Sequence, residues 1–259
     1  MIDINIKDLW EKANKLIPGG NSLLSKNPEL YAPDQWPTYF SKAKGCEVWD
    51  LNGKKFTDIG IMGVGTNLLG FANEEVDLAV HQAISNGNIS TLNCLEEVEL
   101  AERLVSIHPW SDMARFARTG GEANAVAVRL ARSYSKKDNI AICGYHGWHD
   151  WYLALNIKNK KNLDEHLLSG LEVNGVPKNL KNTIFTFSYN DINKLKKLVN
   201  KNNIGIIKME VARNFIPKNN FLNKVRELAT KNKIVLIFDE CTSGFRQNFG
   251  GLHKLYGVN

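Results

Sequence analysis

The sequence has few cysteines and no long hydrophobic run. Its four cysteines, Cys46, Cys94, Cys143 and Cys241, are scattered, and no C-x-x-C pair occurs among them. This spacing argues against a disulfide framework or a structural zinc site and is typical of a reducing compartment. No apolar run approaches the ~20 residues that a membrane-spanning helix needs, and the first ten residues do not resemble a secretory signal. We therefore expect a soluble, cytoplasmic protein.

The sequence also lacks the aromatic residues that would accompany a nucleic-acid-binding surface. The 259 residues carry a formal charge of +6, with a pI near 9.0. However, the lysines are spread through Asn/Lys-rich stretches such as residues 158–161 and 194–203, which contain no aromatic side chain. A single-strand-binding groove interleaves basic and aromatic residues. We expect a solvated basic surface, with no nucleic-acid partner.

Strand and helix patterns alternate along most of the chain. Helices are predicted at residues 7–17, 74–84, 95–107, 122–135, 191–199 and 221–230, and buried strands at 113–117, 139–143, 183–187, 204–210 and 234–239. Two short strands, 46–51 and 55–59, flank the Asn-Gly hairpin signal at 52–53. Apolar strands separated by helices predict an α/β fold, a mostly parallel sheet with helices on both faces. We expect an N-terminal segment at 1–68 and a large domain at 69–259.

A glycine pair follows the strand predicted at residues 113–117. Gly120 and Gly121 run directly into a helix. Glycines let the backbone approach a ligand closely, and the first turn of a helix offers free N–H groups, so the pair predicts a phosphate seat. A simple turn before a helix is the alternative. The glycine pair is not a dinucleotide-binding fingerprint, because the pattern G-x-G-x-x-G is absent.

An aromatic cluster, Gly-Tyr-His-Gly-Trp-His-Asp-Trp at residues 144–151, follows the strand at 139–143. Such a cluster can offer a flat face to a planar ring, or its aromatic residues can pack on one another. A third interpretation is a zinc hydrolase site built from His146, His149 and Asp150, although no H-E-x-x-H pattern is present.

Two later strands end in carboxylates, Glu210 and Asp239. A carboxylate at the end of a buried strand is costly unless a group pairs with it. A protonated pyridine nitrogen would pair with Asp239 and keep it ionised. A helix cap or a hydrogen bond within the loop is the alternative.

Three motifs in order resemble the class III aminotransferases of fold type I, among them the group similar to glutamate-1-semialdehyde aminomutase. They are Gly-Gly-Glu-Ala at residues 120–123, Tyr-His-Gly at 145–147, and Ile-Phe-Asp-Glu at 237–240 with Gly-Phe-Arg at 244–246. The resemblance implies an aminotransferase or aminomutase for a small amino or carbonyl substrate. It also implies pyridoxal 5′-phosphate (PLP) as cofactor and a homodimer as the complete enzyme.

The resemblance further implies a set of cofactor-binding residues: Gly120, Gly121, Tyr145, His146, Glu210, Asn214, Asp239 and Cys241. The amides of Gly120 and Gly121 would hold the phosphate. Tyr145, with His146 beside it, would lie against one ring face and Cys241 against the other. Asp239 would pair with the pyridinium nitrogen, and Glu210 and Asn214 would lie near the ring's substituents.

The sequence departs from the family's pattern in three places. Relatives carry Glu-Pro where this chain has Glu-Val at 210–211. Ser25 stands where the aminomutase has an arginine for the substrate carboxylate, so Ser25 is the expected substrate residue. The family's Schiff-base lysine would come after Asn259.

Because that lysine would lie beyond Asn259, we expect a portion of such an enzyme, inactive alone. The alternative is a non-catalytic fragment, or one half of a split enzyme that needs a second polypeptide. Lys208 is the one lysine within an apolar strand. We expect its stem to pack in the sheet while its amine reaches a carboxylate, rather than to act as the nucleophile.

Overall fold

The computed structural model describes residues 5–33, 35–60, 62–159, 163, 166 and 172–259. The chain divides into two compact units, Met1–Asn93 and Cys94–Asn259. Our division at residues 68 and 69, which separates an N-terminal segment from a cofactor-binding domain, stays a prediction. Residues 160 and 161 of the lysine-rich stretch lie outside the described residues. Within the described ranges, no helix combines the length and hydropathy of a membrane span.

The N-terminal unit contains a three-stranded antiparallel sheet of order β1-β2-β3. Its elements are α1 (Ile6–Leu16), two 3-10 turns (Leu24–Lys26 and Pro28–Leu30), β1 (Phe40–Lys44), β2 (Glu47–Asp50), β3 (Lys55–Thr57), α2 (Met62–Gly65) and α3 (Glu74–Ser85). The predicted hairpin at Asn52 and Gly53 is confirmed. One oxygen of Asp50 accepts from the N–H groups of Asn52 (2.9 Å) and Lys54 (2.8 Å), which closes the turn.

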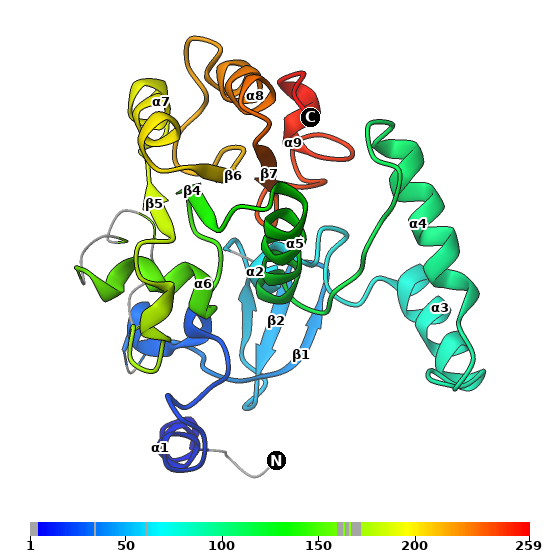
Figure 1. Cartoon of the computed structure of the whole chain (residues 1–259). Helices are drawn as coiled ribbons and strands as arrows, with labels where there is room; N and C mark the ends of the chain where they lie inside the picture. The colour runs from blue at the N-terminus through cyan, green and yellow to red at the C-terminus, as the bar shows by residue number, and fades with distance from the viewer. Residues whose placement is uncertain (1–4, 34, 61, 160–162, 164–165, 167–171) are drawn as a thin grey trace. The chain divides into compact units, whose positions relative to one another are not determined.

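The C-terminal unit is built on a parallel four-stranded sheet of order β5-β4-β6-β7 (Figure 1). Its helices are α4 (Leu95–Ile107), α5 (Gly120–Ser135), α6 (Asp150–Leu153), α7 (Ile192–Lys201), α8 (Phe221–Lys231) and α9 (Leu252–Leu255), with 3-10 turns at Ala154–Ile157 and Lys178–Leu180. Its strands are β4 (Asn139–Cys143), β5 (Ile184–Thr186), β6 (Ile204–Glu210) and β7 (Val235–Asp239). The predicted α/β fold is confirmed.

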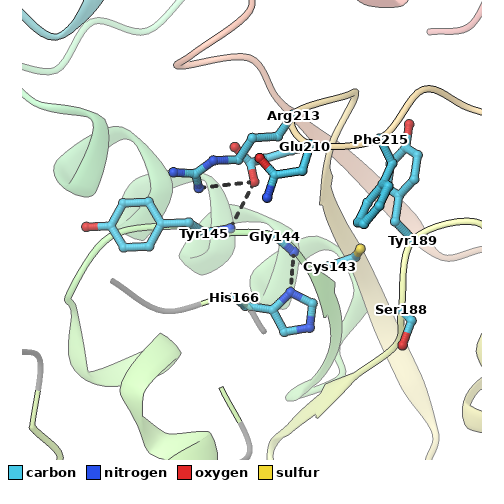
Figure 2. Close-up of a pocket in the computed structure, with 10 residues that line it drawn as sticks. Cys143, Gly144, Tyr145, His166, Ser188, Tyr189, Glu210, Arg213 and Phe215 are labelled. Atoms are coloured by element: carbon cyan, nitrogen blue, oxygen red, sulfur yellow. Dashed lines mark hydrogen bonds and ion pairs between the residues drawn. The ribbon is translucent and has the colours of Figure 1, made fainter. Parts of the chain in front are cut away.

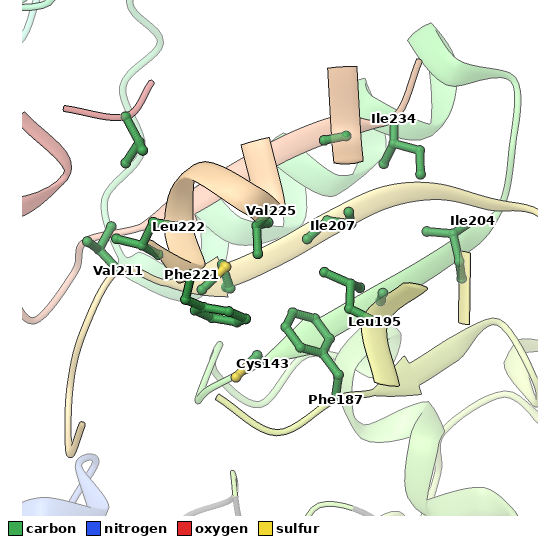
Figure 3. Close-up of a cluster of buried hydrophobic side chains, with 14 of the residues drawn as sticks. Cys143, Phe187, Leu195, Ile204, Ile207, Val211, Phe221, Leu222, Val225 and Ile234 are labelled. Carbon is green, nitrogen blue, oxygen red and sulfur yellow. The ribbon is translucent and has the colours of Figure 1, made fainter. Parts of the chain in front are cut away.

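Both faces of this sheet are covered, because alternate residues of a strand point to opposite sides. On one face, Ala141 and Cys143 of β4 and Ile207 of β6 pack with buried side chains of α7 and α8 (Figure 3). On the other, Ile140 and Ile142 pack with α5, α6 and the 3-10 turn that follows α6. Since Lys208 and Glu210 alternate with the residues of the first core, their side chains point to the α5 side of β6.

The strand order has a switch point between β4 and β6. From β4 the chain continues to β5 on one side, whereas β6 is followed by β7 on the other. In open parallel sheets, ligands bind beyond the carboxyl ends of the strands at such a point. A functional site is therefore expected at the loops that follow Cys143 and Glu210.

The prediction of a strand at residues 113–117 is wrong. This stretch has no regular secondary structure. A strand needs a neighbour to complete its ladder of hydrogen bonds, and in the described part of the chain no strand pairs with this stretch. Its apolar pattern alone does not make it a strand. Strand β1 and the short helices α2, α6 and α9 were not predicted from the sequence.

Candidate functional site

The start of α5 is a capped helix terminus with two free glycine amides. The hydroxyl of Thr119 accepts from the N–H of Glu122 at 3.1 Å, and the carboxylate of Glu122 accepts from the N–H of Arg118 at 3.0 Å. The first N–H groups of a helix have no acceptor within it. The described residues offer no acceptor to the N–H groups of Gly120 and Gly121. These amides are therefore available to an anion.

Close neighbours explain why glycine stands at both positions. A Cβ atom on Gly120 would lie 3.0 Å from the sulfur of Cys241, and one on Gly121 would lie 2.7 Å from Nε2 of His149. The loops after β4 and β7 thus approach the first turn of α5 at side-chain distance. The predicted phosphate seat and the predicted ring-face residue Cys241 are brought together.

The loop after β4 is held by Glu210 at the end of β6. The N–H of Tyr145 donates to one oxygen of Glu210 at 3.0 Å, and the guanidinium of Arg213 lies 3.6 Å from the same oxygen. The hydroxyl of Thr242 donates to the other oxygen at 3.4 Å. Burial raises the pKa of Glu210, while the Tyr145 amide and the Arg213 charge oppose the shift. Glu210 thus joins three loops at the sheet's carboxyl edge.

Replacing Gly144 with alanine is expected to destabilise the protein strongly. Gly144 has a φ of +113°, and a Cβ atom there would lie 2.4 Å from a Glu210 oxygen and 2.9 Å from Cγ of Glu210. The matched control is Gly175→Ala, at a φ of +87° with no atom within 4 Å of the added Cβ. The control should lose about 1–2 kcal/mol of unfolding free energy from backbone strain alone. Gly144→Ala should lose about 1–3 kcal/mol more from the clash. Urea unfolding followed by circular dichroism compares the two, and equal losses would contradict the contact.

Asp239, at the end of β7, is the centre of a buried polar cluster. One of its oxygens accepts from Nδ1 of His146 at 2.9 Å and from Nζ of Lys208 at 3.2 Å, and the other accepts from the N–H of Cys241 at 3.0 Å. Nζ of Lys208 also donates to the amide oxygen of Asn124 at 2.6 Å. The expected partner for the Lys208 amine, a carboxylate, is confirmed. The loop hydrogen bond considered for Asp239 is also present.

The charges in this cluster follow from burial. Burial alone would raise the pKa of Asp239, but the His146 hydrogen bond and the Lys208 charge hold it below its ordinary value, so Asp239 is ionised. Burial lowers the pKa of His146 to about 4, helped by the Lys208 charge, so His146 is neutral at pH 7. Burial also lowers the pKa of Lys208, and Asp239 opposes that shift.

A pocket of about 690 Å³ opens at the switch point between β4 and β6 (Figure 2). Its lining residues are Cys143, Gly144, Tyr145, His166, Ser188, Tyr189, Glu210, Arg213, Asn214 and Phe215. The N–H of Gly144 donates to Nδ1 of His166 at 3.1 Å. The Arg213 guanidinium lies over the Tyr145 ring, 5.6 Å from its centroid. The pocket thus presents one cation, one carboxylate and aromatic walls.

The predicted site residues fall into three groups. Tyr145, Glu210 and Asn214 line the pocket. Gly120, Gly121, His146, Asp239 and Cys241 lie along the neighbouring edge, where β7 ends and α5 begins. Ser25 belongs to the N-terminal unit, where its carbonyl accepts from the Tyr31 hydroxyl at 2.6 Å. The cofactor and substrate roles of these residues stay predictions.

The zinc alternative is not supported by the geometry. The His146 side chain is buried, with Nδ1 bonded to Asp239, whereas the His149 ring stacks on Trp148, with centroids 4.7 Å apart. In the ranges that the structure describes, no group of three His, Cys, Asp or Glu residues converges as metal ligands.

Two pocket residues, Arg213 and His166, were not predicted from the sequence. Arg213 follows Glu210 by three residues as the strand ends, and this proximity to a strand-end carboxylate was a usable signal. His166 reaches Gly144 across 22 positions, and no local pattern predicts such a contact. Asn124, the second acceptor of the Lys208 amine, was not predicted either, because it lies within helix α5 rather than at the end of a strand.

Known proteins resemble this chain in sequence and in fold. Residues 31–255 match the family model of the class III aminotransferases. The chain is 34% identical to 3-aminobutyryl-CoA aminotransferase of Cloacimonas acidaminovorans, over 96% of this chain and 58% of that protein. It is 33% identical to glutamate-1-semialdehyde 2,1-aminomutase of Methanobrevibacter smithii, over 97% of this chain and 58% of that protein. The chain thus spans about 58% of the length of these relatives.

Solved structures show the same fold. An omega-transaminase from Sphaerobacter thermophilus superposes with a TM-score of 0.84 at 24% identity, over all of this chain and 59% of that one. A transaminase with PLP bound superposes with a TM-score of 0.84 at 25% identity, over all of this chain and 60% of that one. The family expected from the three motifs is confirmed, together with its fold, and one of these similar structures contains PLP. The chain belongs to the class III aminotransferases.

Proposed function

We propose that this chain is the PLP-binding portion of a class III aminotransferase or aminomutase that acts on a small amino or carbonyl substrate. The observation that carries the proposal is the meeting of two features at one edge of the sheet. The free amides of Gly120 and Gly121 begin α5, and the ionised Asp239 ends β7. Cys241 joins them, because its N–H bonds Asp239 and its sulfur lies against Gly120. When bound, PLP supplies an electron sink for carbanion chemistry.

The residues at this edge fit such a cofactor. A phosphate is an anion that the first turn of a helix binds through free N–H groups and the positive end of the dipole, as Gly120 and Gly121 present them. A protonated ring nitrogen needs an ionised acceptor, which Asp239 provides. Tyr145 offers an aromatic face beside the pocket, with Arg213 over its ring. Glu210 and Asn214 line the same pocket, where the reacting part of a substrate would enter.

The remaining chemistry requires a lysine that we expect after Asn259 in the family's pattern. We propose that sequence corresponding to the rest of the relatives supplies it, in the same or in a second polypeptide. The complete enzyme is proposed to be a cytoplasmic homodimer that takes an amino donor and a carbonyl acceptor. The kinds of reaction named for the relatives, amino transfer and amino migration, support a substrate with an amino or carbonyl group.

PLP is expected to bind the 259-residue chain reversibly and without a covalent link. Equilibrium dialysis with absorbance detection measures the binding. Borohydride reduction followed by mass spectrometry should then show no adduct on Lys208, because Lys208 is fully buried and already bonded to Asn124 and Asp239. A stable adduct on one unique lysine would show that the chain carries its own nucleophile.

Gly121→Ala is expected to weaken PLP binding about tenfold or more, since the added methyl group blocks the approach of a phosphate. The fold should be retained, because alanine favours helix and the nearest atom, Nε2 of His149, ends a side chain that can rotate. Pyridoxal, which lacks the phosphate, is the matched control ligand, and its affinity should be unchanged. Equal losses for both ligands, or none for PLP, would remove the glycine pair as phosphate seat.

A further inference from the structure

Arg213 is a cation with unused hydrogen-bond donors at the wall of the pocket between β4 and β6 (Figure 2). Among the described residues that line this pocket, it is the one lysine or arginine. Its side chain is 35% exposed, so a dissolved ligand can reach it. A guanidinium has five N–H donors, and no described residue accepts a hydrogen bond from that of Arg213. These donors are therefore available to a ligand.

Two neighbours hold the guanidinium of Arg213 in place without occupying its donors. Nη1 lies 3.6 Å from an oxygen of Glu210, which is an ion-pair distance but too long for a hydrogen bond. The ring centroid of Tyr145 lies 5.6 Å from Cζ of Arg213. A cation–π contact uses the flat face of the guanidinium, whereas its N–H groups lie along the edge. Glu210 and Tyr145 thus orient the group and leave its N–H edge open.

The charges around Arg213 suit a carboxylate on a ligand that also carries an amino group. The carboxylate of Glu210 is buried and already accepts from the N–H of Tyr145 and the hydroxyl of Thr242. The arginine and the glutamate balance each other, and a ligand with one ammonium and one carboxylate is likewise neutral, so it meets no net repulsion. A guanidinium fork matches the two oxygens of a carboxylate. A phosphate monoester carries nearly two negative charges, which one arginine beside a glutamate does not balance.

Arg213 shares its two neighbours with the proposed cofactor site. Tyr145, whose ring lies against the guanidinium, is one of the proposed cofactor residues. Glu210 accepts from Thr242, which directly follows Cys241 in the chain. Resting on the proposed function, we propose that Arg213 binds a carboxylate of the substrate. The site therefore prefers an amine that carries an acid group to an amine of the same shape that does not.

The test uses reduced adducts of PLP with an amine, which carry cofactor and substrate in one molecule and need no lysine. Phosphopyridoxyl adducts of glycine, β-alanine and 4-aminobutanoate cover three chain lengths, and each is paired with the adduct of the corresponding amide, which is uncharged at that end. Titration calorimetry measures their binding to the wild-type chain, to Arg213→Gln and to Lys218→Gln. Lys218 is an exposed cation of the same loop and is not among the residues that line the pocket, so it is the matched control.

At one chain length or more, the wild type and the control should bind the acid adduct about tenfold or more tightly than its amide, because a charge-assisted, bidentate contact is lost in the amide. In Arg213→Gln this ratio should fall to about twofold or less, with the affinity for the amide adduct within about threefold of the wild type. A distorted pocket would instead weaken both adducts equally.

Arg213→Lys, which keeps the charge beside Glu210 but not the guanidinium fork, replaces the glutamine variant if circular dichroism shows that the latter is unfolded, and its ratio should also fall. Equal affinities for acid and amide at every chain length in the wild type overturn the role of Arg213, as does an unchanged ratio in its variants or an equal loss in Lys218→Gln. Binding of the adducts then still supports the proposed function. No binding of any adduct to the wild type overturns both.

Discussion

Asp239→Asn is expected to lower the free energy of unfolding by about 3–5 kcal/mol, because it leaves the buried Lys208 ammonium without its counter-charge. Asparagine has the shape of aspartate, and its oxygen can still accept from the N–H of Cys241. Its NH2 group then faces Nδ1 of His146 and Nζ of Lys208, so the loss reports charge and hydrogen bonding rather than volume. Lys208 has no exposed surface through which its amine could reach water. Urea unfolding at pH 7.5, followed by circular dichroism, measures the change.

The control is the same substitution at a half-buried position outside the cluster, Asp191→Asn. Asp191 caps α7 by accepting from the N–H of Lys194 at 2.8 Å, and asparagine caps a helix equally well, so its effect should stay within about 0.5 kcal/mol. The double variant Asp239→Asn with Lys208→Met should recover much of the lost stability, since it removes both charges. A double variant as unstable as Asp239→Asn alone would show that the two residues are not energetically coupled.

Acidification is expected to destabilise the fold between pH 6.5 and pH 4. Burial depresses the pKa of His146 from 6.5 to about 4, so in this interval the unfolded chain binds a proton that the folded chain does not. Stability is full above pH 6.5 and falls as the pH drops toward 4, by roughly 3 kcal/mol for a shift of this size. Asp239, whose pKa is also held below its ordinary value, extends the loss to lower pH. Urea unfolding at several pH values measures the slope.

His146→Asn isolates the histidine contribution. The asparagine amide nitrogen occupies the place of Nδ1 and can still donate to Asp239, but it does not titrate. The variant should therefore lose much of the pH dependence between 6.5 and 4. Glu210, whose pKa is raised, contributes in the opposite sense in both proteins and cancels in the comparison. An unchanged slope would mean that His146 is not buried in its neutral form.

The local patterns in the sequence predicted most of the C-terminal unit. The bounds of α4, β4 and β6 agree with those expected, and β5, β7, α7 and α8 differ by a residue or two at their ends. These segments are strongly apolar or amphipathic, and the period of the hydrophobic pattern alone indicates whether each is a helix or a strand. Residues 113–117 were mispredicted, because a strand also requires a neighbour that no local pattern specifies.

Individual residues of the site could be predicted from the sequence, but their arrangement in space could not. The glycine pair and the strand-end carboxylates mark the carboxyl edge of the sheet, since their chemistry is local. The convergence of Lys208, Asn124 and His146 with Asp239 depends on which strands are neighbours and which face α5 covers. That information lies in the order β5-β4-β6-β7, which sequence periodicity does not contain. The sequence predicted that the amine of Lys208 would reach a carboxylate, but it did not identify Asp239 as that carboxylate.

The place of β4 between β5 and β6 has a consequence for synthesis on the ribosome. β4 is made first, yet its partners on both sides, beginning at Ile184 and Ile204, emerge later. At roughly 5–20 residues per second, the stretch from Cys143 to Glu210 takes on the order of 3–13 s to translate. During that interval the apolar Ile140 and Ile142 lack the strands that later flank them. Chaperone binding to nascent chains should therefore peak after β4 emerges and decline once β6 is complete.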